Sequence, residues 1–229
     1  MQQSLITPGL FGQNVPADSK RKYFDYCNEQ ILSMGKIPDI LFIGDSITEF
    51  WDTQLYFGEM GFIVNRGIAG DDTQYILKRC EADVLQLKPK KIVYKAGINN
   101  LMSVAPDLWW RTPGRDKKEV MEETISNIEK FMKKCEGADG YFCSVLPTDM
   151  HTWHKDCEIN ESVIELNEKI VDLCEKYKMT YVDYHSAVCR EDGKTLKDGI
   201  SYDGVHPNSI GYKIMADKLK EKINNKFGG

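Results

Sequence analysis

The chain has 229 residues, of which 41% are hydrophobic and 28% charged, with a formal net charge of -5 at pH 7. This composition is ordinary for a soluble globular protein, and residues 1–229 are expected to form a single domain. The negative charge, with no concentrated basic patch to offset it, argues against a nucleic-acid partner. No apolar run approaches membrane-spanning length, so no membrane span is expected.

The segment from Met1 to Pro8 lacks the basic region and apolar core of a secretory leader. A cytoplasmic location is therefore the expectation, with secretion left open because a leader could have been removed. Seven cysteines are scattered without a CxxC pair. An odd number at this spacing favours free thiols over a disulfide framework.

Short apolar strands alternate along the chain with amphipathic helices. The first helix is predicted over residues 18–34 and packs on the domain through one apolar face: Tyr23, Phe24, Cys27, Ile31 and Leu32. The predicted strands are 39–44, 62–65, 91–96, 141–146 and 180–184. The remaining predicted helices are 73–87, 115–135, 160–177 and 207–227. Strands separated by helices favour parallel pairing with right-handed crossovers, and hence an α/β fold with a three-layer α/β/α sandwich.

Polar segments directly follow the first three predicted strands: Gly44-Asp45-Ser46, residues 65–70, and Gly97-Ile98-Asn99-Asn100. In a parallel sheet the ligand site lies at the carboxyl ends of the strands. We therefore expect the three segments to converge on one site.

Ser46 is predicted to open a short helix that runs to Trp51. A helix N-terminus supplies backbone N–H groups and a partial positive charge, which can stabilise an oxyanion once the serine oxygen has attacked a carbonyl. The alternative is that Ser46 only caps the helix, a position that serine favours. The motif alone leaves both interpretations open.

Asp203 and His206 lie three residues apart on a predicted turn. The carboxylate can accept from one imidazole nitrogen while the other takes a proton from Ser46. Pro207 suits the first position of the last helix, which would make His206 its N-cap and keep the imidazole neutral. The alternative is a simple turn followed by a cap.

Gly70 and Asn99 are the candidate oxyanion donors beside Ser46 itself. Gly70 lets a backbone N–H approach a ligand closely, and Asn99 offers a side-chain amide after a buried strand. Removing one such donor typically costs about 3 kcal/mol of transition-state stabilisation. For Gly70, a turn that merely precedes a helix remains the alternative.

The chain resembles the GDSL or SGNH hydrolases over about residues 39 to 220. The resemblance lies in four sequence blocks that occur in the same order as in that family: Gly-Asp-Ser, Asn-x-x-x-x-Gly, Gly-x-Asn and Asp-x-x-His. The resemblance implies a flavodoxin-like sandwich, a serine nucleophile, and ester hydrolysis without a metal or organic cofactor. Carried over by position, it implies a triad of Ser46, Asp203 and His206. It also implies an oxyanion hole formed by the Ser46 N–H, Gly70 and Asn99.

Two of the four blocks depart from the commonest family pattern. The third block often reads Gly-Thr-Asn-Asp, and Asn100 here resembles the subgroup similar to platelet-activating-factor acetylhydrolases. Ile47 stands where leucine is commoner. The absence of Gly-x-Ser-x-Gly around Ser46 argues against the nucleophile elbow of α/β-hydrolases.

Trp109 and Trp110 follow the third block. They could stack on a sugar ring, line an acyl pocket, pin their loop to the core, or cover a contact in a homo-oligomer. With Asp45 and Asn100, they are the candidate substrate contacts.

His151 and His154 match no common zinc motif, so a loop at the rim is favoured over a metal site. His185 is expected to be a hydrogen-bonded structural histidine.

The sequence thus predicts a carboxylic-ester hydrolase that forms an acyl-enzyme. The absence of a long apolar lid favours a short-acyl, typically acetyl, ester of a carbohydrate or small molecule. A lysophospholipase or thioesterase is the alternative within this chemistry. A non-catalytic glycan- or lipid-binding module is the alternative from another class.

Overall fold

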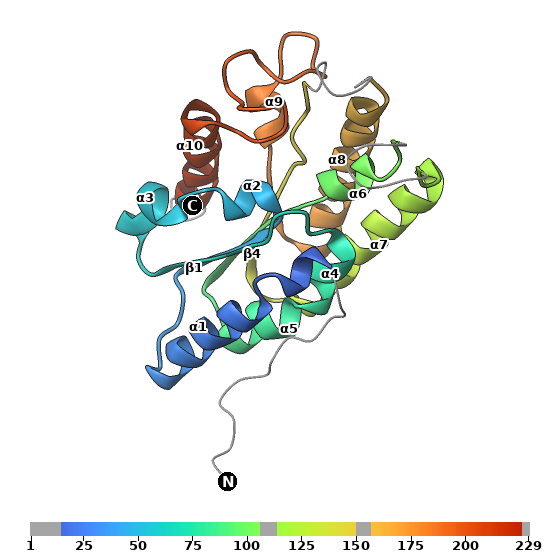
Figure 1. Cartoon of the computed structure of the whole chain (residues 1–229). Helices are drawn as coiled ribbons and strands as arrows, with labels where there is room; N and C mark the ends of the chain where they lie inside the picture. The colour runs from blue at the N-terminus through green and yellow to red at the C-terminus, as the bar shows by residue number, and fades with distance from the viewer. Residues whose placement is uncertain (1–14, 106–113, 150–156, 226–229) are drawn as a thin grey trace. The chain divides into compact units, whose positions relative to one another are not determined.

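The computed structural model describes residues 15–105, 114–149 and 157–225 (Figure 1). The chain divides into two compact units, each described here by itself. The first unit comprises residues 1–96 and 127–141, and the second comprises residues 97–126 and 142–229.

Five strands form a sheet in the order β2-β1-β3-β4-β5, the order of flavodoxin-like folds. The strands are β1 Ile40–Gly44, β2 Ile63–Gly67, β3 Lys91–Lys95, β4 Asp139–Cys143 and β5 Thr180–Val182. Strand β1 pairs in parallel with both β2 and β3, with Gly44 opposite Gly67 on one side and Lys95 on the other. The prediction of an α/β fold with a parallel, flavodoxin-like sheet flanked by helices is confirmed.

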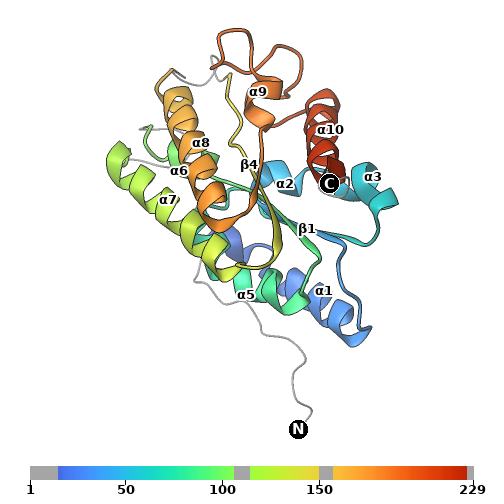
Figure 2. The ribbon, with the colours of Figure 1, turned by 180° about the vertical axis from the view of Figure 1, so that it is seen from behind.

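Helices connect the strands in both units (Figures 1 and 2). The first unit contains η1 Pro16–Asp18, α1 Arg21–Ser33, α2 Ser46–Glu49, α3 Thr53–Phe57, η2 Gly58–Met60, α4 Thr73–Lys78, α5 Cys80–Asp83 and η3 Leu85–Leu87. The second contains α6 Ile98–Met102, α8 Cys157–Tyr177, α9 Tyr184–Val188 and α10 Ser209–Asn225. Helix α7, Lys117–Lys134, has residues in both.

The buried side of helix α1 is more polar than predicted. Of the predicted residues, Phe24 is buried, Cys27, Ile31 and Leu32 are half-buried, and Tyr23 is 62% exposed, while Arg21 and Asn28 are buried as well. Arg21 forms an ion pair with Asp83 of α5, which lies beside α1 in Figure 1, and Asn28 donates to the carbonyl of Ala82. The helix therefore packs through a polar stripe with fixed partners, which a search for apolar periodicity overlooks.

The predicted helix over residues 73–87 is interrupted at Arg79. Helix α4 ends at Lys78 and α5 begins at Cys80, and η3 follows. Ile76, Cys80 and Val84, at apolar positions of this segment, are buried. The apolar spacing located the buried side, but it did not show that the helix breaks.

In the second unit, α8 contacts α6 and β5, and α10 contacts α9 and β5 (Figure 2). The side chains of Asn160 and Asn167 on α8 hold the segment that follows β4. Each amide both accepts from and donates to one residue's main chain, Asn167 at Val145 and Asn160 at Thr148. Because these bonds fix the backbone, the segment is ordered without belonging to a strand.

Within the described part of the chain, no helix combines the length and apolar character needed to cross a bilayer.

Candidate functional site

Ser46 is the first residue of α2, directly beyond the carboxyl end of β1, and it is 6% exposed. The cap of this helix is Asp45, whose carboxylate accepts from the N–H of Ile47 at 3.0 Å. The alternative in which Ser46 itself is the N-cap is therefore wrong. Ser46 sits inside the first turn, where backbone N–H groups have no helical acceptor.

The turn before Ser46 requires glycine. A Cβ on Gly44 would collide with the carbonyl oxygen of Lys95 and with the hydroxyl of Thr48. Strands β1 and β3 thus approach each other closely at the end of β1, and α2 folds back at once over that end. The glycine of the Gly-Asp-Ser block is needed for this geometry.

Asp45 is fully buried and forms an ion pair with Lys95, the last residue of β3, at 3.2 Å. Together with the cap on Ile47, this contact fixes the turn that carries Ser46. The described contacts of Asp45 are therefore structural, and a contact between Asp45 and substrate stays a prediction.

Gly70 has a φ of +79°, a conformation that favours glycine, and it lies in the loop between β2 and α4. Two bonds tie this loop to the Ser46 region, from the Ile68 N–H to the carbonyl of Gly44 and from the Ala69 N–H to the carboxylate of Glu49. The ring of Pro16 lies 3.2 Å from where a Cβ on Gly70 would be. The loop is a turn before α4, as one interpretation expected, and it is anchored to α2.

A buried ionic network lies behind these two segments, and sequence reasoning missed it. Its centre is Arg79, which is 0% exposed and contacts both Asp71 and Asp83. Asp83 also pairs with Arg21. The only sequence signal was opposite charges four and eight residues from Arg79 within a segment of otherwise apolar spacing.

The two carboxylates of this network have opposite pKa shifts. Burial raises the pKa of Asp71 to about 7, against the opposing effect of Arg79. Burial also acts to raise the pKa of Asp83, but the hydrogen bond from Arg21 and the charges of Arg79, Arg21 and Arg66 lower it below its ordinary value. Both Arg21 and Arg79 contact Asp83, and their combined effect exceeds that of burial, whereas at Asp71 the effect of burial exceeds that of Arg79.

Asp203 and His206 lie together in the second unit, on the turn before α10. The Oδ2 atom of Asp203 lies 2.6 Å from Nδ1 of His206. Its Oδ1 accepts from the N–H groups of Val205 and His206, and Ser201 Oγ accepts from the N–H groups of Asp203 and Gly204. Burial acts to raise the pKa of Asp203, but the hydrogen bonds from His206 and Val205 outweigh it and lower the pKa.

The last helix begins later than predicted, and His206 is not its N-cap. Helix α10 starts at Ser209, and the side chain of Asn208 accepts from the N–H groups of Ile210 and Gly211. Pro207 instead forms an isolated bridge with Ser201. The expected N-cap role of His206 is therefore wrong, and the partner that orients its imidazole is Asp203.

Asn99 and Asn100 lie in the first turn of α6 and not at the end of a strand. Strand β3 ends at Lys95, and Gly97, with a φ of +127°, precedes the helix. The two asparagines are 5% and 4% exposed. Leu166 and Val145 lie 3.0 Å from where a Cβ on Gly97 would be, so this turn also depends on glycine. The structure assigns Ser46 and Gly70 to the first unit and Asn99, Asp203 and His206 to the second.

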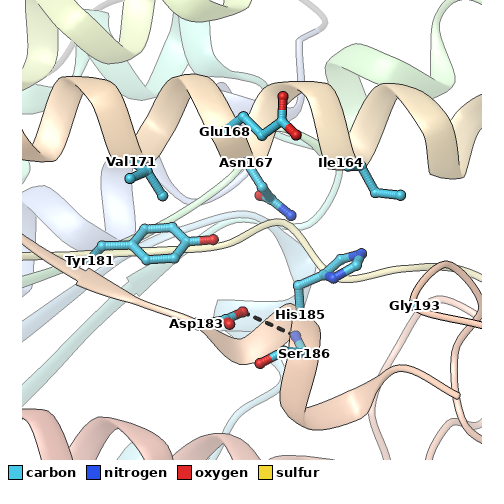
Figure 3. A pocket seen from close by; sticks show the side chains of 9 residues that line it. All are labelled: Ile164, Asn167, Glu168, Val171, Tyr181, Asp183, His185, Ser186 and Gly193. Carbon is cyan, nitrogen blue, oxygen red and sulfur yellow. Dashed lines mark hydrogen bonds between the residues drawn. The ribbon is translucent and has the colours of Figure 1, made fainter. Parts of the chain in front are cut away.

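His185 lines a pocket of about 340 Å³ between α8 and α9 (Figure 3). The backbone N–H of His185 donates to Ser144 Oγ at 2.7 Å, and the ring Nδ1 lies 3.4 Å from Cys189 Sγ. Burial lowers the pKa of His185, against the opposing charge of Asp183. These contacts agree with the expected structural histidine.

Four of the predicted residues lie outside the described part of the chain: Trp109, Trp110, His151 and His154. Over the described ranges, no three His, Cys, Asp or Glu side chains are grouped as ligands for a metal ion.

A flavodoxin-like sheet with Gly-Asp-Ser after β1 and Asp-x-x-His before the last helix defines the class of SGNH-type α/β proteins. Residues 42–214 match the GDSL-like Lipase/Acylhydrolase family, and the chain belongs to this family. The family predicted from the four sequence blocks is confirmed.

Similar proteins carry esterase and acetylhydrolase names. An acetylxylan esterase of Xylanibacter ruminicola is 25% identical over 177 residues, 70% of this chain and 33% of its own length. The human platelet-activating factor acetylhydrolase IB subunit alpha2 is 35% identical over 77 residues, 32% of this chain and 34% of its own length. The chain thus spans about a third of the length of these curated relatives.

The fold also matches a solved structure, that of a GDSL-like lipase from Bacteroides thetaiotaomicron. The TM-score is 0.71 at 23% identity, and the match covers 89% of this chain and 99% of that one.

Proposed function

We propose that this chain hydrolyses carboxylic esters through an acyl-enzyme on Ser46. His206 takes the proton of Ser46 as its oxygen attacks the carbonyl carbon, and Asp203 orients the imidazole and stabilises its charged form. The oxyanion accepts from the N–H groups of Ser46 and Gly70 and from the side chain of Asn99.

The tetrahedral intermediate collapses when the bond to the leaving alcohol breaks and the alcohol takes the proton from His206. Water then attacks the acyl group on Ser46 and gives a proton to His206. As the bond between the acyl carbon and the Ser46 oxygen breaks, His206 returns its proton to that oxygen, which releases the carboxylic acid and restores the serine hydroxyl. The reaction consumes one ester and one water and needs no other reactant.

The observation that carries this proposal is the 2.6 Å contact between Asp203 Oδ2 and His206 Nδ1. A carboxylate that engages Nδ1 selects Nε2 as the nitrogen that exchanges a proton with the nucleophile. A pair serving only as a turn and a cap would have no need of this bond, and the capping in this segment is done by Asn208.

We infer that the substrate is a short-acyl ester, most simply an acetyl ester of a carbohydrate or small molecule. Two of the relatives are named for acetyl esters, one on xylan and the other on platelet-activating factor. Asn100, which follows Asn99 in α6, is a candidate contact for the substrate, together with Trp109 and Trp110.

Replacement of the nucleophile tests the proposal directly. Ser46→Ala should lower kcat for p-nitrophenyl acetate at least about a thousandfold, because in the proposed mechanism the Ser46 hydroxyl is the group that accepts the acyl group. Circular dichroism and thermal unfolding verify folding, and Ser33→Ala, at an exposed serine of α1, is the matched control. Turnover by Ser46→Ala equal to that of the control would falsify the proposal and favour a binding module.

A further inference from the structure

One buried guanidinium joins the two segments that carry backbone donors in the first unit. Arg79 donates to the carbonyl of Gly44 at 3.0 Å and to the carbonyl of Arg66 at 2.7 Å. It also donates to the carboxylates of Asp71 at 2.8 Å and Asp83 at 3.1 Å. Three different stretches of chain, at the ends of β1 and β2 and at the start of α4, therefore meet on one side chain.

The acceptors lie next to the residues that the mechanism uses. Gly44 precedes Ser46 by two residues, and Asp71 directly follows Gly70. We infer that Arg79 is a positioning residue that fixes the separation of the Ser46 and Gly70 N–H groups. This inference rests on the proposed function. Arg79 acts through the main chain and need not touch the substrate.

The chemistry of the side chain supports positioning over simple stabilisation. A guanidinium is a rigid planar fork, so bonds to two carbonyls and two carboxylates fix direction as well as distance. A buried ion pair adds little net stability, because desolvation of the charges offsets their attraction. Arg79, Asp71 and Asp83 are each 0% exposed. The free energy lost by desolvating these charges is explained if the site needs the backbone geometry that they fix.

The same unit holds a matched control for this inference. Arg21 is also buried, at 6% exposure, and it pairs with the same Asp83. On its own helix, Arg21 contacts the carboxylate of Asp25 and the ring of Phe24. Replacing Arg21 perturbs the same ionic network at Asp83, while the side chain of Arg79 keeps its bonds to Gly44 and Asp71.

The experiment compares Arg79→Lys and Arg79→Met with Arg21→Met, all assayed on p-nitrophenyl acetate well below their unfolding transitions. Lysine keeps the charge but cannot reproduce the four-way fork. Arg79→Lys should lower kcat about tenfold to hundredfold with KM within about threefold, since a misplaced oxyanion donor acts in the transition state. Arg21→Met should keep kcat within about twofold of wild type, whatever its loss of thermal stability.

An alkyl boronic acid, which becomes a tetrahedral anion when a serine adds to it, provides the second measurement. Its Kd should weaken in Arg79→Lys by about the factor lost in kcat/KM, which a merely structural role would not produce. If Arg79→Met fails to fold, Arg79→Lys decides. Equal kcat in Arg79→Lys and Arg21→Met, or unchanged boronate binding, would overturn the inference. Failure of the proposed function appears separately, as turnover by Ser46→Ala.

Discussion

At the scale of single residues, the notable feature is that two carboxylates sharing Arg79 have opposite pKa shifts. Asp83 is held below its ordinary pKa by two guanidinium partners, whereas burial raises the pKa of Asp71 to about 7. At Asp71 the effect of burial exceeds the opposing effect of Arg79, whereas at Asp83 the combined effect of Arg21, Arg79 and Arg66 exceeds that of burial. Asp71 therefore binds a proton more readily in the folded chain than in the unfolded chain.

This shift predicts a pH-dependent stability difference. An unfolded aspartate has a pKa of about 3.9, so between about pH 4 and pH 7 the folded state binds more protons at Asp71 and loses stability as pH rises. Asp71→Asn keeps an acceptor for Arg79 and removes this titration. We expect the unfolding free energy of Asp71→Asn, relative to wild type, to increase from pH 4.5 to pH 7.5 in urea titrations. A constant difference across that range would show that Asp71 does not titrate there.

At the scale of elements, the positions of the strands and the buried apolar sides of the helices could be predicted from the sequence. The contacts between buried polar groups could not. Apolar runs located all five strands to within a few residues. The polar part of the buried side of α1 was missed because the partners of Arg21 and Asn28 are distant in sequence. The residues of the proposed triad could be predicted because each lies in a short, local sequence block. Arg79 was missed because its role depends on where Gly44 and Asp71 fold.

The start of α10 is set by the side chain of Asn208, although Pro207 favoured an earlier start. Asn208 accepts from two N–H groups of the helix, so Asn208→Ala should lower the unfolding free energy by about 1 kcal/mol. Asn208→Asp or Asn208→Ser should restore most of this loss, as measured by urea unfolding. Lys213→Ala, at an exposed residue of α10, serves as the control. A loss in Asn208→Ala no larger than in the control would argue against the cap.

At the scale of the whole molecule, the proposed machinery is divided between two compact units. The nucleophile and two backbone donors belong to the first, and the acid–base pair and Asn99 belong to the second. The proposed function therefore requires residues from both units. Contacts within each unit position the residues that it contributes, such as those of Arg79 in the first and Asp203 in the second.

Acyl-chain preference is a property of the complete substrate site and distinguishes the remaining alternatives. We expect kcat/KM to be highest for acetyl esters and to fall at least about tenfold for octanoyl and longer chains, because a short-acyl site cannot accommodate them. The measurement is one preparation assayed on p-nitrophenyl esters of two to sixteen carbons and on acetylated xylo-oligosaccharides. A preference for long chains would favour the lysophospholipase or thioesterase alternative.

The turn that carries Asp203 and His206 makes its described hydrogen bonds almost wholly among neighbours, from Ser201 to His206. Such a segment behaves as a cassette whose internal shape does not depend on how much chain precedes it. A change in the length of the chain before Ser201 should therefore leave the contact between Asp203 and His206 intact. For the proposed mechanism, the requirement on such a change is that the turn still reaches the same place in the fold.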